Sequence, residues 1–320
     1  MEKRVLLTEN IEKDGIEYLE KMGYEVKVAR GTSEDILVEE VRDCDAMLVR
    51  MANITAKVIQ AGCKLKVISK FGVGVDNIDV EEATKQGIQV TNSAESNNNT
   101  VAEYTIGLIL ALSKKFFLYD HELRKGNFGI RNSLGIDLKE KVIGIIGAGS
   151  IGKLVAKKAV LGFGMKVIEL KRHKDFEPED GIKYTYDIEY LLKNSDFVSL
   201  HVPLTEETSK LIGEKEISIM KPEAFLINTA RGGVVDNEAL VNALLNNKIA
   251  GAAVDVYEGE IPSKDNPLFK LDNVIVTPHT AAHTIEGMQR MSVHPAIGIH
   301  EVLSGKRPSW PVNDVEEMKK

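Results

Sequence analysis

One segment restricts the fold more than any other: an apolar run leads directly into a glycine loop, and a helical pattern leads out of it. VIGII at 142–146 precedes GAGSIG at 147–152, and an amphipathic stretch at 153–164 is followed by MKVIEL at 165–170. In a strand–loop–helix–strand unit the three glycines serve a tight turn, close approach of backbone to a pyrophosphate, and close helix–strand packing. A tight turn without ligand is the alternative, but this context favours a dinucleotide-binding loop. The residues expected to bind there are Gly147, Gly149, Ser150, Ile151 and Gly152.

The rest of the chain repeats the alternation of short apolar runs with helical patterns. Ser33 is expected to cap a helix over SEDILVEEV. Strands separated by helices predict parallel sheets covered on both faces, and hence an α/β fold. The expected strands are Val5–Leu7, Tyr24–Val28, Ala46–Val49, Leu65–Ile68, Val142–Ile146, Lys166–Leu170, Phe197–Leu200, Phe225–Asn228, Gly251–Val254 and Val274–Val276.

Two long segments stand apart from this alternation. Residues 100–123 form a helical pattern with apolar residues on more than one face, which is typical of a buried or interface helix. Residues 121–141 are polar and rich in glycine, and we expect an irregular excursion there. A further helix is predicted from Thr284 to about Leu303.

Length and composition limit the classes of protein to which this chain can belong. A length of 320 residues suggests about two domains. A net charge of −7 disfavours nucleic-acid binding, which needs a positive field. No apolar run is long enough to span a membrane, and no signal peptide is evident at the start. Cys44 and Cys63 cannot form a disulfide framework, so we expect a cytoplasmic protein.

Three charged residues follow predicted strands, where α/β folds place their chemistry. Arg231 follows FLIN, Glu260 comes after Asp255 at the end of GAAV, and His279 follows VIVTP. Each could be an ordinary surface or capping residue. Together they fit a chemical requirement: a histidine paired with a carboxylate retains a proton to donate, and an arginine grips a carboxylate through two hydrogen bonds.

Other histidines carry weaker signals. His279 and His283 are spaced like a helical zinc pair, but HTAAH lacks the glutamate of the zinc-protease motif and no third ligand stands out, so no metal site is predicted. His201 follows the strand FVSL and precedes Pro203, and we expect it to line a cleft wall.

Taken together, these segments resemble the D-isomer-specific 2-hydroxyacid dehydrogenases, and in particular the short phosphoglycerate, hydroxypyruvate and glyoxylate reductases. The resemblance runs from about Val5 to Asn313. It rests on GVGVDNID (72–79), VAE (101–103), GIIGAGSIG (144–152), HVPLTEET (201–208), MKPEAFLINTARGGVVDNEAL (220–240), GAAVDVYEGE (251–260) and TPHTAA (277–282).

The resemblance implies two doubly wound domains and a role for each charged residue. A flavodoxin-like substrate domain would comprise residues 1–100 and 285–320, and a Rossmann dinucleotide-binding domain residues 101–284, with the reaction in the cleft between them. Arg231 would bind the carboxylate and carbonyl of a 2-oxo acid. His279 would protonate the carbonyl oxygen, and Glu260 would keep His279 protonated.

The resemblance also implies the remaining contacts. The backbone of Gly72, Val73 and Gly74 would bind the substrate carboxylate, and Asp255 the nicotinamide carboxamide. The helix from Thr100 and the excursion after it would form a homodimer interface. Further cofactor contacts within the shared motifs would be His201, Pro203, Thr208, Thr229, Ala230 and Ala281.

Two features bear on specificity. Lys171, followed by Arg172, stands where NAD-dependent members carry an acid that binds the ribose 2′-hydroxyl, while Glu169 lies within the strand. NADP is therefore expected in preference to NAD; the alternative is a solvated Lys171 with NAD bound through its pyrophosphate alone. Arg50 and Lys70 follow substrate-domain strands, where phosphoglycerate dehydrogenases are basic, so the substrate is expected to carry a second anionic group such as a phosphate. The alternative is that both are solvated surface charges.

Two other functions share this fold. A non-enzymatic dinucleotide sensor, similar to the C-terminal-binding corepressors, would retain the same three residues, but the chain lacks their extension. A formate dehydrogenase would carry glutamine in place of Glu260. The dehydrogenase is the favoured interpretation.

Overall fold

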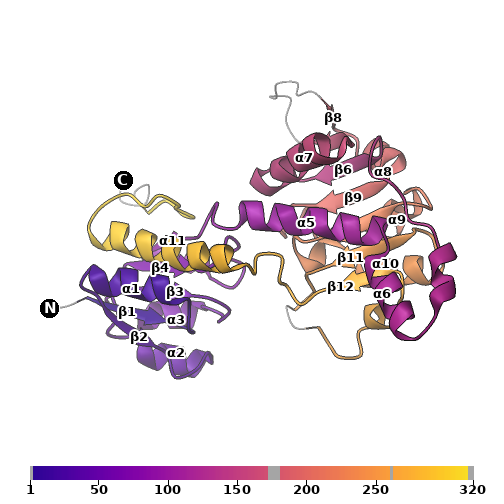
Figure 1. The fold of residues 1–320 in the computed structure, drawn as a ribbon. Coiled ribbons are helices and arrows are strands. Elements are labelled where there is room, and N and C mark those ends of the chain that lie inside the picture. Colours follow the sequence, from indigo (N-terminus) through magenta and orange to yellow (C-terminus); the bar gives the residue numbers. More distant parts are fainter. Residues whose placement is uncertain (1–2, 172–180, 260–261, 316–320) are drawn as a thin grey trace. The chain divides into compact units, whose positions relative to one another are not determined.

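The computed structural model describes residues 3–171, 181–259 and 262–315. These form two compact units, one of residues 1–97 with 283–320 and the other of residues 98–282 (Figure 1). The division that the sequence predicts is residues 1–100 with 285–320, and residues 101–284. Each unit contains one parallel sheet, which confirms the α/β class with two parallel sheets.

The first unit is a five-stranded sheet of order β2-β1-β3-β4-β5, the order of doubly wound flavodoxin-like folds. Helices α1 and α11 pack together on one face (Figure 1), and α2, α3 and α4 enclose the core of the other. Thr284 caps α11 by accepting a hydrogen bond from Gly287 N. The elements are β1 Arg4–Leu7, α1 Lys13–Lys21, β2 Glu25–Val28, α2 Glu34–Glu40, β3 Ala46–Val49, α3 Ala56–Ala61, β4 Val67–Lys70, α4 Val80–Lys85, β5 Gln89–Thr91 and α11 Ile285–Leu303.

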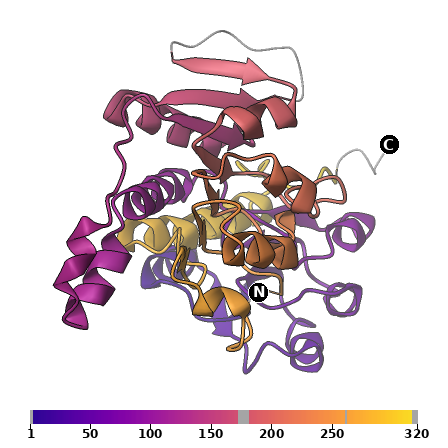
Figure 2. The ribbon, with the colours of Figure 1, turned by 90° about the vertical axis from the view of Figure 1, so that its right-hand side faces the viewer.

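The second unit is a seven-stranded sheet of order β12-β11-β10-β9-β6-β7-β8. Helices α5 and α7 cover one face and α8, α9 and α10 the other; β8 is an edge strand (Figure 2). The elements are α5 Asn98–Ser113, α6 Phe116–Arg124, η1 Phe128–Asn132, β6 Val142–Ile146, α7 Ser150–Phe163, β7 Lys166–Leu170, β8 Ile182–Thr185, α8 Ile188–Asn194, β9 Phe197–Leu200, α9 Glu214–Ser218, β10 Phe225–Asn228, η2 Gly232–Val234, α10 Asn237–Leu245, β11 Gly251–Val254, η3 Pro267–Lys270 and β12 Val274–Val276.

The structure differs from the sequence-based expectation in three places. The helical pattern over 100–123 is two helices, because Lys115 adopts a left-handed φ of 55° that ends α5 before α6 begins. Strands β5 and β8 were not predicted: both are short and polar, and β8 lies at the sheet edge. Ser33 stands at the N-cap of α2, but its side chain makes no capping hydrogen bond.

Candidate active site

The glycine loop joins β6 to α7, and two of its glycines are required by close packing. Gly147 has a φ of 101°, and a Cβ there would lie 2.5 Å from the carbonyl carbon of His201. A Cβ on Gly152 would lie 2.2 Å from the carbonyl oxygen of Gly147. In contrast, a Cβ on Gly149 would meet nothing within 4 Å. The loop is therefore packed at both ends and open in the middle.

That open position suits the phosphates of a dinucleotide. Helix α7 is 14 residues long and begins at Ser150 and Ile151, with Gly149 as an N-cap that has no side chain to cover the helix end. The first N–H groups of a helix and its positive dipole end attract anions. Strands β6 and β9 are neighbours at the point where the strand order reverses, where doubly wound sheets bind ligands.

His201 and the turn after it form the wall next to the loop. The backbone N–H of His201 donates to Ile146 O at 2.7 Å, and its Nε2 lies 2.8 Å from Ser199 Oγ. His201 is half-buried, and the desolvation of its imidazole lowers the pKa of His201 to about 4. Thr208 is buried and donates to Pro203 O at 2.6 Å, so it braces the turn from within.

Lys171 directly follows β7 and is already paired. Its Nζ lies 2.9 Å from a carboxylate oxygen of Glu169 and 4.6 Å from the centre of the Tyr184 ring. The Glu169 side chain is only 2% exposed, against 15% for Lys171. The predicted base at this strand end is thus present together with a buried counter-charge. Arg172 lies outside the described residues.

Adjacent strands β10, β11 and β12 bring the candidate catalytic residues to one sheet edge. Asn228 pairs with Val254, and Val254 with Val276, so these strands end at the same level. Arg231 follows β10 and His279 follows β12 within a few residues. Between them, Asp255 directly follows β11. Glu260 lies outside the described residues.

Asp255 fixes the segment that carries His279. It is fully buried, and its Oδ1 accepts hydrogen bonds from Thr277 Oγ1 at 2.6 Å and Thr280 N at 2.9 Å. Its Oδ2 accepts from Ala281 N at 2.8 Å. Its carbonyl oxygen accepts from His279 N at 2.8 Å, while His279 has a left-handed φ of 54°. Such strain persists where the surroundings impose it, as at active sites.

Arg231 is held by its own turn. Asn228 accepts from Ala230 N and donates to Arg231 O, both at 3.0 Å. The Arg231 Nη1 donates to Ala230 O at 2.8 Å, and the residue is half-buried. A Cβ on Gly232 would lie 2.1 Å from Tyr257 C, so glycine is required where this turn meets the segment after β11.

Helix α5 supplies contacts that the sequence did not indicate. The hydroxyl of Thr105 lies 3.1 Å from that of Thr229, and the Tyr104 hydroxyl lies 3.2 Å from Thr280 Oγ1. Neither residue belongs to a motif with catalytic chemistry. Only their position beside the VAE segment could have drawn attention to them.

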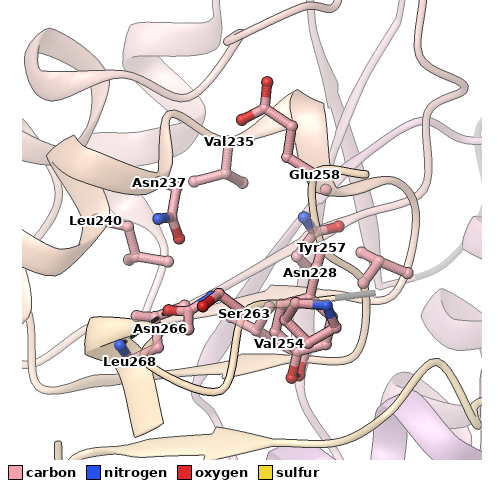
Figure 3. A pocket seen from close by; sticks show the side chains of 13 residues that line it. Asn228, Val235, Asn237, Leu240, Val254, Tyr257, Glu258, Ser263, Asn266 and Leu268 are labelled. Atoms are coloured by element: carbon pink, nitrogen blue, oxygen red, sulfur yellow. Dashed lines mark hydrogen bonds between the residues drawn. The ribbon is translucent and has the colours of Figure 1, made fainter. Parts of the chain in front are cut away.

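A cavity of about 310 Å³ lies beside these turns (Figure 3). Asn228 and Gly232, which flank Arg231, contribute to it, and Asn237, Glu258 and Asn266 add polar groups. Its described lining includes neither Arg231 nor His279. The cavity therefore adjoins the candidate catalytic turn and is distinct from it.

The predicted substrate residues belong to the first unit. Arg50 follows β3; its Nη1 donates to Asn10 O at 3.2 Å, and its guanidinium lies 5.4 Å from the centre of the Phe71 ring. Strands β1 and β3 are neighbours where this sheet reverses its strand order, the position at which doubly wound sheets bind ligands. Lys70 is 9% exposed, and its Nζ donates to Arg50 O and to Asn77 Oδ1.

The segment after β4 contains the three residues predicted to bind the substrate carboxylate through their backbone, Gly72, Val73 and Gly74. Gly72 has a φ of 114°, which favours glycine, and its N–H donates to Ser93 Oγ at 3.3 Å. Val73 is exposed and Gly74 half-buried.

Among the residues that the structure describes, no group of three or more His, Cys, Asp or Glu side chains could hold a metal ion, and His279 and His283 fall in different units. No helix among the same residues is long and apolar enough to cross a membrane.

The chain belongs to the D-isomer specific 2-hydroxyacid dehydrogenase family, whose NAD binding domain matches residues 106–281. The family resemblance expected from the motifs is thereby confirmed. The protein is an NAD(P)-dependent oxidoreductase that acts on the CH–OH group of 2-hydroxy acids. Its small-molecule partners are 2-oxo or 2-hydroxy acids and the dinucleotide.

Two curated relatives illustrate the range within the family. A glyoxylate reductase of Thermococcus litoralis is 41% identical over 98% of this chain and 97% of its own length. A D-3-phosphoglycerate dehydrogenase of Methanocaldococcus jannaschii is 42% identical over 97% of this chain, which spans only 59% of that relative.

Solved structures show the same fold with either cofactor. A D-lactate dehydrogenase of Aquifex aeolicus, complexed with NAD and lactic acid, has a TM-score of 0.85 at 30% identity, covering 97% of this chain and 99% of the other. An NADPH-dependent glyoxylate/hydroxypyruvate reductase of Sinorhizobium meliloti, complexed with NADP and malonate, has a TM-score of 0.85 at 28% identity, covering 98% and 97%.

Proposed function

We propose that the protein reduces a 2-oxo acid to the D-2-hydroxy acid, with Arg231 and His279 as its catalytic residues. The observation that supports this most is the alignment of β10, β11 and β12, which end at one level and are followed by Arg231, Asp255 and His279. Arg231 offers the substrate carboxylate a charge-assisted grip. His279 donates a proton to the carbonyl oxygen, and Glu260 stabilises the protonated imidazole.

The glycine loop is proposed to hold the cofactor. Gly147, Gly149 and Gly152 shape the loop, and the N–H groups of Ser150 and Ile151 bind the pyrophosphate. When bound, the nicotinamide supplies the hydride. His201, Pro203, Thr208, Thr229, Ala230, Asp255 and Ala281 are proposed to border the same site; Asp255 and Ala281 already bind each other in the turn that carries His279.

NADP is proposed as the preferred cofactor. The strand end after β7 carries Lys171 in place of an acid that would repel a 2′-phosphate. Glu169 offsets part of the Lys171 charge at 2.9 Å, so the preference over NAD is small. Arg172 is proposed to add a second cation.

The substrate is proposed to carry a second anionic group, bound by Arg50. The planar guanidinium has five N–H donors, and the contact with Asn10 O uses one of them. A phosphate, as in 3-phosphohydroxypyruvate, or a second carboxylate would suit it. Gly72, Val73 and Gly74 would bind the carboxylate next to the carbonyl.

A homodimer and a cytoplasmic location are proposed on separate grounds. Helix α6 and the segment after it stand away from the sheet in Figure 2, and five apolar residues there are more than half exposed. These apolar residues are Phe116, Phe117, Leu123, Phe128 and Leu134. Sedimentation equilibrium would test the dimer.

The proposed cytoplasmic location rests on the cysteines. Cys44 and Cys63 are both free thiols, as expected in a reducing compartment.

A panel of 2-oxo acids tests the function. Oxidation of NADPH or NADH would be followed with glyoxylate, hydroxypyruvate, 2-oxoglutarate and 3-phosphohydroxypyruvate. Turnover is expected, with the highest kcat/KM for a substrate with two anionic groups. Dinucleotide binding without turnover of any member would overturn the proposal and favour the dinucleotide sensor.

A further inference from the structure

Lys70 is a buried lysine at the proposed binding edge of the five-stranded sheet. It is the last residue of β4 and is 9% exposed. An ammonium carries three hydrogen-bond donors and no acceptor, and it is rarely buried unless those donors find partners. Its partners therefore indicate what the side chain does.

The ammonium of Lys70 connects the two segments that follow β3 and β4. Its Nζ donates to the carbonyl oxygen of Arg50 and, at 2.7 Å, to Asn77 Oδ1. The amide of Asn77 in turn donates to Ala52 O at 2.7 Å and to Arg50 O at 3.4 Å. Lys70 and Asn77 thus hold the turn at 50–52 against the segment at 72–77.

The backbone of Lys70 is tied to the second segment as well. Ser93 Oγ donates to Lys70 O at 2.9 Å and accepts from Gly72 N at 3.3 Å. Ser93 N donates to Gly72 O at 2.9 Å. The glycine with the left-handed backbone is thereby fixed directly after the lysine.

We propose that Lys70 is a positioning residue: through Asn77 it holds Arg50 and the Gly72–Gly74 backbone in the arrangement that receives the substrate, and it makes no contact with the substrate. The proposal rests on the proposed function of those two segments. It replaces the expectation that Lys70 grips a phosphate, because Lys70 is 9% exposed and its ammonium already holds the Arg50 carbonyl and Asn77 Oδ1. Arg50, which is half-buried, is the cation that meets the second anionic group.

The two roles predict different kinetics. We would measure kcat and KM of Lys70→Met with hydroxypyruvate and with 3-phosphohydroxypyruvate. A positioning role raises KM for both substrates, about tenfold for hydroxypyruvate, because the Gly72–Gly74 backbone binds the carboxylate that both carry, with a smaller change in kcat. A direct contact raises KM for the phosphorylated substrate alone, and that result would overturn the proposal. Lys66→Met, an exposed lysine just before the same strand, is the matched control and should match wild type.

Asn77→Ala is the second variant, since it breaks the same link and keeps the ammonium. It should reproduce the rise in KM for both substrates, and the KM values of the double variant should be no higher than those of either single variant, because both changes remove one connection. A lower melting temperature with unchanged KM values in both single variants would show a merely structural role and would also overturn the proposal. Absence of turnover in the wild type would instead count against the proposed function.

Discussion

In the proposed function, the two units use the same kind of sheet edge for different kinds of binding. In the seven-stranded unit the edge is made of backbone: Gly147 and Gly152 pack closely, and Gly149 leaves space above the start of α7. In the five-stranded unit the edge is made of side chains that hold one another, with Lys70 and Asn77 bridging two segments. A backbone site suits phosphates shared by every dinucleotide, whereas a side-chain site can be changed to select a substrate.

The largest effect should come from the catalytic turns of the seven-stranded unit. His279→Ala and Arg231→Ala are each expected to lower kcat/KM by about 10²-fold or more, since a positioned proton donor contributes about 10²–10⁴-fold. Dinucleotide affinity, measured by fluorescence titration, should change little. His283→Ala, an exposed histidine of the other unit, serves as the control and should keep full activity. Equal losses of kcat/KM in all three variants would contradict the assignment of Arg231 and His279 as catalytic residues.

A substitution within α7 tests whether backbone packing shapes the cofactor edge. Gly152→Ala places a Cβ 2.2 Å from Gly147 O, and overpacking of this kind costs about 1–3 kcal/mol. Gly162→Ala, on the same helix with nothing within 4 Å, should be neutral or stabilising by about 0.5–1 kcal/mol. Thermal unfolding and dinucleotide titration would be compared. Equal stability and affinity in the two variants would show that the loop is not tightly packed.

Cofactor preference should respond to the pair at the end of β7. Lys171→Asp is expected to shift the NADPH-to-NADH ratio of kcat/KM about tenfold or more toward NADH, which corresponds to about 1.4 kcal/mol. Glu169→Gln should shift the ratio the other way, because it removes the carboxylate 2.9 Å from the Lys171 ammonium. Lys166→Asp, at the exposed start of the same strand, is the control. Shifts in the same direction for both variants would argue against this pairing.

The smallest expected effect is on the pH dependence of folding stability. Burial lowers the pKa of His201 from 6.5 to about 4, so the folded protein binds this proton less readily than the unfolded chain. Stability should therefore fall as pH drops from 6.5 toward 4. In His201→Gln the melting temperature should fall less steeply over that range. Parallel curves for variant and wild type would show that other groups dominate the acid response.

The sequence predicted the backbone site better than the side-chain site. The glycine loop and the strands around it are local patterns, because tight turns and parallel strands impose their residues over a few positions. The tie from Asp255 to Thr280 and Ala281, and the contact of Lys70 with Asn77, depend on which hydrogen bonds form once strands align. A basic residue after a strand looks the same in sequence whether it points to a ligand or is buried under the turn.

The stereochemistry of the product tests the central claim most directly. Hydroxypyruvate would be reduced with NADPH by the wild-type protein, and the glycerate formed would be resolved by chiral chromatography. D-glycerate should form in step with NADPH oxidation. Formation of L-glycerate, or no glycerate with the cofactor bound, would contradict the proposed function.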